Sequence, residues 1–114
     1  MKTLRLFPKE IILQSFKKTL FDAWIDGSLS VEELAIIDTR KTELKITEQE
    51  HSMIEREVQI LCYEENLKKS WKDGSINQSE QEELERLRRD LKISAEQHLE
   101  LEQKVRRMVQ TPPP

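Results

Sequence analysis

This chain of 114 residues has little of what most catalytic and metal sites are built from. It contains one cysteine, two histidines and two glycines. A single cysteine excludes an internal disulfide and suits a reducing compartment, where a buried structural thiol is the default. Two glycines leave no glycine-rich phosphate loop, and no nucleophile, base and acid stand in a recognisable pattern. We therefore expect no enzyme activity, no cofactor and no small-molecule substrate.

Long apolar runs and a strong charge of one sign are also missing. No stretch approaches the roughly 18 uninterrupted apolar residues of a spanning helix, and Pro8 interrupts the apolar start. The net charge of −3 is too small to steer the chain toward nucleic acid or an anionic membrane. Basic residues at 86–92 and 106–107 follow acidic residues, an order that the helix dipole favours in a solvated helix. We expect a cytoplasmic protein that binds neither nucleic acid nor a membrane.

The sequence does contain a repeat. Sliding it by 47 residues aligns 16–63 with 63–110 without a gap, and 12 of the 48 pairs are identical, where about three are expected by chance. The identical pairs lie at expected helix ends and at apolar positions: Leu20/Leu67, Trp24/Trp71, Asp26/Asp73, Gly27/Gly74, Ser28/Ser75, Glu33/Glu80, Leu44/Leu91, Lys45/Lys92, Ile46/Ile93, His51/His98, Glu55/Glu102 and Val58/Val105. We expect two copies of one supersecondary unit.

Helix signals recur with the same period. Each glycine follows a segment with apolar residues at helical spacing, which indicates a helix C-terminus. Four capping boxes indicate helix starts: Ser30 with Glu33, Thr47 with Glu50, Asn77 with Glu80, and Ser94 with Gln97. The pattern predicts an all-α bundle of five helices at about 8–25, 30–44, 47–72, 77–91 and 94–109. The third helix is shared by the two 47-residue repeats, residues 1–110 form one domain, and 111–114 is a proline-rich tail or linker stub.

The segment after each tryptophan resembles the second half of an EF-hand calcium loop. With Gly27 at the sixth loop position, the possible calcium ligands are Asp22, Asp26, Ser30 and Glu33, but Trp24 occupies the third position, where an oxygen ligand is expected. The second copy has Lys69 and Trp71 at the first and third positions. The resemblance implies two helix-loop-helix units with Leu29 and Ile76 near each other. The pattern W-x-D-G-x-[IL]-x3-E, later L-K-I-[ST]-x3-H, is also similar to helical modules of unassigned role in bacterial and archaeal proteins. Calcium binding by the first loop is the alternative function.

Differences between the copies indicate where function lies. Apolar residues of the first copy, Phe21, Ile25, Leu34 and Ile36, face polar residues of the second, Lys68, Lys72, Gln81 and Glu83. These four apolar side chains are the candidate partner-binding patch, either for another protein or for a second copy in a homodimer. The competing interpretation is that Leu4 and Leu6 cover the patch within the chain. We expect a non-catalytic protein-interaction or adaptor module.

Overall fold

The computed structural model describes residues 8–72 and 74–110, which form five α-helices and no strand. In chain order these are α1 (Lys9–Trp24), α2 (Val31–Glu43), α3 (Glu48–Ser70), α4 (Gln78–Asp90) and α5 (Ala95–Gln110). The prediction of an all-α chain with five helices is confirmed, and every helix end lies within two residues of its expected place. Leu4, Leu6 and the tail at 111–114 lie outside the described residues. Among those described, no helix is long and apolar enough to cross a membrane.

All four predicted capping boxes are formed. At the start of α2 the Ser30 hydroxyl accepts from the Glu33 N–H at 3.0 Å, while the Glu33 carboxylate accepts from the Ser30 N–H at 2.8 Å. The same reciprocal pairs begin the other three helices: Thr47 with Glu50, Asn77 with Glu80, and Ser94 with Gln97. A capping box satisfies backbone donors that the first helical turn leaves unpaired, so these four helix starts are fixed locally.

The helix ends also depend on local backbone geometry. Gly27 and Gly74 both have φ of 90°, which glycine adopts without a Cβ clash. Two lysines, Lys45 and Lys92, have φ of 55° and 57° just after α2 and α4. In these turns the N–H of the next residue, Ile46 or Ile93, reaches back to a carbonyl in the last turn of the helix, at 3.0 and 2.8 Å. The turns at Lys45 and Lys92 therefore have the hydrogen bonds of a Schellman motif, with lysine at the position where glycine is usual.

Lys92→Gly is expected to raise the free energy of unfolding by about 0.5 kcal/mol. The left-handed conformation costs a non-glycine residue about 1–2 kcal/mol, which exceeds the entropy that glycine adds to the unfolded chain. Urea unfolding followed by circular dichroism measures the change. Lys69→Gly, within the last turn of α3, is the matched control and should lower stability by about 1 kcal/mol. If both variants lose stability equally, the turn after α4 is not strained.

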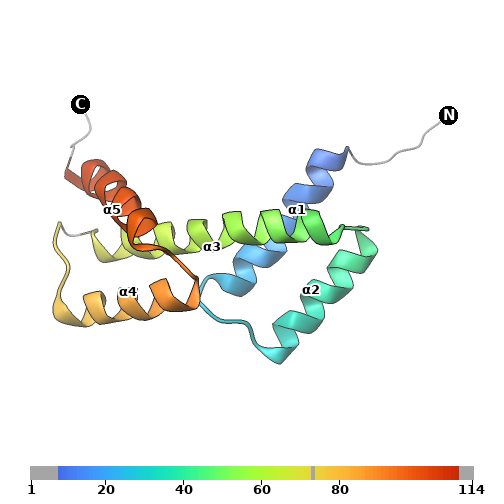
Figure 1. Cartoon of the computed structure of the whole chain (residues 1–114), viewed down its shortest axis with the longest axis horizontal. Coiled ribbons are helices and arrows are strands. Elements are labelled where there is room, and N and C mark those ends of the chain that lie inside the picture. The colour runs from blue at the N-terminus through green and yellow to red at the C-terminus, as the bar shows by residue number, and fades with distance from the viewer. Residues whose placement is uncertain (1–7, 73, 111–114) are drawn as a thin grey trace.

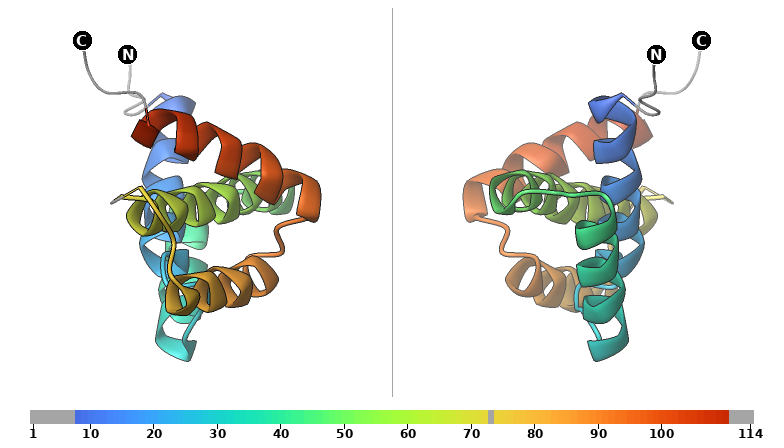
Figure 2. Two further views of the ribbon diagram at one scale, coloured as in Figure 1. Left: turned by 90° about the vertical axis from the view of Figure 1, so that its left-hand side faces the viewer. Right: turned by 90° about the vertical axis from the view of Figure 1, so that its right-hand side faces the viewer.

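Helix α3 is the axis of the molecule. Its 23 residues span about 35 Å; α1, α4 and α5 pack along it, and α2 packs against α1 (Figure 1). Helices α1 and α2 lie toward the N-terminal half of α3, while α4 and α5 lie toward its C-terminal half (Figure 2). The structure measures 55 × 39 × 22 Å, and its radius of gyration of 17.0 Å exceeds the roughly 13 Å of a compact chain of this length. The fold is therefore elongated and flat.

The core follows both halves of α3. Its fully buried side chains are Phe16, Leu20, Val58, Cys62, Tyr63, Leu67, Leu91 and Val105. Burial raises the pKa of the Cys62 thiol to about 12, so it stays protonated near neutral pH. The expected buried, structural cysteine is confirmed.

The loop between α1 and α2 packs against the far end of α4. A Cβ added to Gly27 would lie 2.6 Å from Cδ2 of Leu87 and 3.7 Å from Cβ of Asp90, both in the last turn of α4. The second loop precedes the first turn of α4, roughly 18 Å away along that helix (Figure 1). The expected proximity of Leu29 and Ile76 is therefore wrong, because each loop lies at a different end of α4.

Arg56 joins α3 to the turn between α4 and α5. Its guanidinium donates to the Leu91 carbonyl at 3.2 Å, to Gln59 Oε1 at 3.1 Å and to Gln97 Oε1 at 2.8 Å. The Leu91 carbonyl belongs to the residue that ends α4, where carbonyls lack helical partners. Arg56 thus satisfies a helix terminus from a neighbouring helix.

Candidate functional site

Two of the four predicted partner-binding residues lie beside α3. Phe21 and Ile25 are half-buried and pack against the core. The Cys62 Sγ lies 3.8 Å from the Phe21 carbonyl, and Asn66 Nδ2 donates to the Ile25 carbonyl at 3.2 Å. These side chains therefore contribute part of their surface to the α1–α3 packing.

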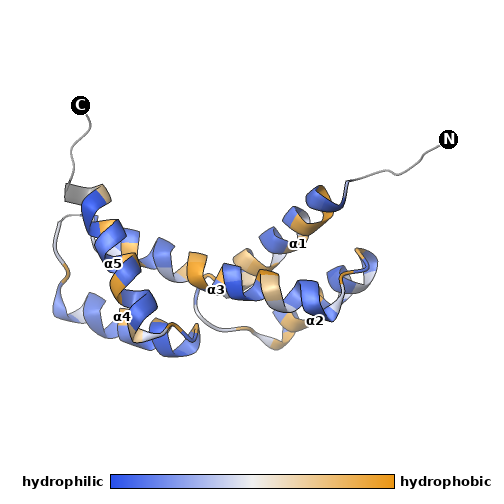
Figure 3. Ribbon diagram, turned by 45° about the horizontal axis from the view of Figure 1, so that its top comes forward, coloured by the Kyte–Doolittle hydropathy of each residue, from blue (hydrophilic) through white to orange (hydrophobic). Residues whose placement is uncertain are grey.

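The other two predicted residues are exposed on α2. Leu34 is 49% exposed and Ile36 is 56% exposed, while their neighbour Ile37 is buried at 3%. Val31, at the start of the helix, is 78% exposed. We call Val31, Leu34, Ala35 and Ile36 the α2 surface. In Figure 3 hydrophobic residues lie at the start of α2, whereas α4 is mainly hydrophilic.

The α2 surface covers two flanks of its helix. Residues two positions apart do not face each other on a helix, so Leu34 and Ile36 lie to either side of Ile37. On one flank Ile36 lines a groove of about 280 Å³ with Ala23, Asp22 and Glu33. Phe21 and Ile25 are not among the residues that line this groove. The four predicted residues therefore do not form one continuous face.

The candidate calcium ligands are engaged with the protein itself. The Glu33 carboxylate completes the α2 capping box, and Asp26 Oδ1 accepts from the Ser28 N–H at 3.2 Å. Asp22 forms an ion pair with Lys18 at 2.9 Å. Within residues 8–72 and 74–110, no three His, Cys, Asp or Glu side chains are grouped so that they could hold a metal ion. The geometry gives the calcium alternative no supporting observation.

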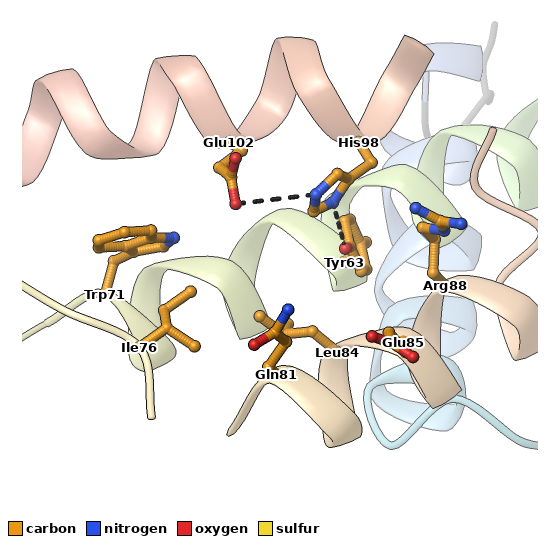
Figure 4. Close-up of a pocket in the computed structure, with 9 residues that line it drawn as sticks. All are labelled: Tyr63, Trp71, Ile76, Gln81, Leu84, Glu85, Arg88, His98 and Glu102. Carbon is orange, nitrogen blue, oxygen red and sulfur yellow. Dashed lines mark hydrogen bonds and ion pairs between the residues drawn. The ribbon is translucent and has the colours of Figure 1, made fainter. Parts of the chain in front are cut away.

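A polar cavity that we did not predict lies between α3, α4 and α5. Its volume is about 330 Å³ (Figure 4). Helix α3 and its end contribute Tyr63 and Trp71, α5 contributes His98 and Glu102, and the remaining lining comes from the segment that leads into α4 and from α4 itself: Ile76, Gln81, Leu84, Glu85 and Arg88. We call this the α3–α4–α5 cavity.

One wall of the cavity is a chain of three polar side chains. Tyr63 Oη and His98 Nδ1 are 2.6 Å apart, and His98 Nε2 lies 3.7 Å from Glu102 Oε2 (Figure 4). Burial raises the pKa of Tyr63 to about 12, so the phenol keeps its proton near neutral pH. This arrangement fixes the orientation of the imidazole.

The matching positions in the first half of the chain are arranged differently. Phe16 replaces Tyr63 there, and it meets the edge of His51 with ring centroids 5.3 Å apart. Trp24 Nε1 donates to Glu55 Oε2 at 3.2 Å, whereas Trp71 Nε1 is buried without a hydrogen-bond partner among the described residues. The Arg106 guanidinium instead lies over the Trp71 ring, 5.0 Å from the ring centroid.

Neither protein-family models, nor curated proteins, nor solved structures give a match to this chain. The candidate sites are therefore interpreted from their own geometry.

The cavity was missed because its residues looked structural one at a time. Tyr63 and Trp71 fit an apolar helical stripe, His98 fits a helix start, and Arg88 fits a solvated basic face. One signal was available: Tyr63 stands where the first copy has Phe16, both opposite a histidine. The hydroxyl of Tyr63, which Phe16 lacks, is the sequence difference that indicates a polar environment in the second copy.

Proposed function

We propose that this protein is a non-catalytic interaction module that associates with a second copy of itself through the α2 surface. The observation that supports this most is that Leu34, Ala35, Ile36 and Ile37 point to all sides of α2, yet only Ile37 is buried. Most of α2 is polar, but this one turn is apolar on all sides, whereas a surface helix normally carries polar residues on the side away from the core. We infer that a partner covers the remaining sides.

We further propose that the fold consists of two EF-hand-like helix-loop-helix units that share α3. Helices α2 and α4 begin at Val31 and Gln78, 47 residues apart, and their capping boxes and positive-φ lysines have the same spacing. At the positions that match Leu34, Ala35 and Ile36, α4 carries Gln81, Glu82 and Glu83. The unit therefore tolerates polar residues there, which supports a binding role for the apolar residues of α2.

The charges of α2 favour a second copy as the partner. Its first turn is acidic, with Glu32 and Glu33, and its last turn is basic, with Arg40 and Lys41. An antiparallel pair of α2 helices would place acidic turns beside basic turns and oppose the two helix dipoles. A two-fold axis would also present Leu34 and Ile36 twice in the same interface.

The double variant Leu34→Gln, Ile36→Glu tests this proposal. It places on α2 the residues that α4 carries at the matching positions, so the helix should remain folded. Because each side chain occurs twice in a symmetric dimer, we expect the dissociation constant to rise about 100-fold or more, and the variant to be a monomer where the wild type is a dimer. Sedimentation velocity over a concentration series measures both.

The control is Leu99→Gln with Met108→Gln on α5. These side chains are 55% and 51% exposed, so the change removes as many exposed apolar side chains elsewhere. It should leave the mass unchanged. A wild-type mass of one chain throughout the series, or equal weakening by the control, would show that the α2 surface does not mediate self-association.

A further inference from the structure

The α3–α4–α5 cavity contains two hydrogen-bond donors whose counterparts in the first half are satisfied. Lys41, which matches Arg88, is ion-paired with Glu48. The position that matches Glu48 is Ala95, and the Arg88 side chain forms no ion pair or hydrogen bond with any described residue. Trp24 donates to Glu55, but Trp71 Nε1 has no partner although Glu102 is present. In both cases a donor that is paired in the first half of the chain has no partner among the described residues, and both donors line the same cavity.

Neither donor has an acceptor among the described residues, and of the two only Trp71 Nε1 is buried. A buried N–H without a partner costs about 1–3 kcal/mol, and a guanidinium binds carboxylates through two parallel hydrogen bonds. Figure 4 places Arg88 and Trp71 at opposite ends of the cavity, with Ile76 and Leu84 between them. The site therefore combines a cation at one end with apolar surface along its length.

The size and charge of the cavity restrict the ligand further. A volume of 330 Å³ holds about ten water molecules or a small organic molecule. Glu102 already faces His98 at 3.7 Å, and Glu85 is exposed to solvent, which screens its charge. Glu102 therefore stands beside the His98 wall, whereas Glu85 lies at the exposed rim, one helical turn before Arg88 on α4 and without an ion pair to its guanidinium (Figure 4).

We propose that the α3–α4–α5 cavity binds a small organic carboxylate with an apolar body. The carboxylate pairs with Arg88, and the body packs between Leu84, Ile76 and the indole of Trp71. This site is separate from the α2 surface, so it does not depend on self-association. Because His98 is held in place by Tyr63, the wall beside Arg88 is preformed for such a ligand (Figure 4).

Phenylacetate is the probe, and phenethylamine is the comparison because it has a similar body with the opposite charge. The two indole N–H resonances in a ¹H–¹⁵N spectrum are followed at constant ionic strength, with Trp71→Phe assigning them. A ligand of roughly ten non-hydrogen atoms is expected to bind with a dissociation constant of about 1 mM. We expect phenylacetate to shift the Trp71 resonance and not the Trp24 resonance, and phenethylamine to shift neither.

Arg88→Gln is expected to weaken phenylacetate binding at least tenfold. Its neighbour Arg89 does not line the cavity, so Arg89→Gln is the matched control and should bind as the wild type does. The unchanged Trp24 resonance confirms that each variant is folded. No shift of the Trp71 resonance up to about 20 mM phenylacetate, an equal shift with phenethylamine, or unchanged binding by Arg88→Gln would each overturn the proposal.

Discussion

Gly27→Ala is expected to lower the free energy of unfolding by about 3 kcal/mol, whereas Gly74→Ala is expected to lower it by about 1 kcal/mol. Both glycines have φ of 90°, so both alanines pay the same backbone cost. At Gly74 nothing lies within 4 Å of the new Cβ, but at Gly27 it would lie 2.6 Å from Leu87 Cδ2. Leu87 is 2% exposed and has little room to move, so overpacking adds about 1–3 kcal/mol.

Urea unfolding of both variants, followed by circular dichroism, measures this difference. A double-mutant cycle with Leu87→Val identifies its source, because valine lacks the Cδ2 methyl group that the alanine would meet. In that background Gly27→Ala should cost only about 1 kcal/mol, like Gly74→Ala in the wild type. If the two glycine variants are equally destabilised in the wild-type background, the first loop does not pack tightly on α4.

Arg56→Met is expected to lower the free energy of unfolding by about 2.5 kcal/mol. Methionine retains much of the aliphatic packing but removes all three hydrogen bonds from the guanidinium. The Leu91 carbonyl at the end of α4 and the buried Gln59 amide then lose a charged donor. Hydrogen bonds to charged groups contribute about 1.5–3 kcal/mol, and a buried acceptor without a partner adds a desolvation cost.

Thermal and urea unfolding measure the effect, with Arg89→Met as the control. Arg89 is exposed on α4, and no hydrogen bond or ion pair of its side chain is seen in the described part of the chain, so its replacement should change stability by less than about 0.5 kcal/mol. Equal losses in both variants would indicate a general effect of removing positive charge instead of loss of the contact with the turn after α4.

The helices were predictable because their limits are encoded within a few residues. Each capping box links two side chains three positions apart, and Gly27 ends its helix segment through its own φ preference. The relative position of the two loops was not predictable in this way. It depends on α3 being one unbroken helix, which separates the loops and brings Gly27 to Leu87, 60 residues later in the sequence.

The candidate sites were predictable only in part. Comparing the repeated positions singled out Leu34 and Ile36 as apolar residues with polar counterparts, and both are exposed. Phe21 and Ile25 gave the same signal, yet both are partly buried and pack against the core, which no pattern of neighbouring residues shows. The α3–α4–α5 cavity requires three helices to meet, so Arg88 and Trp71 acquire a common environment only in the folded chain.

Helix α3 also has a consequence for how the molecule unfolds. Helix α1 packs against it as far as Cys62 and Asn66, and α4 and α5 pack against its C-terminal half, so both groups of helices depend on the same central helix (Figure 1). Melting either half would fray the hydrogen-bond ladder of the helix on which the other half rests. The two ends of this elongated fold should therefore lose structure in a single cooperative transition.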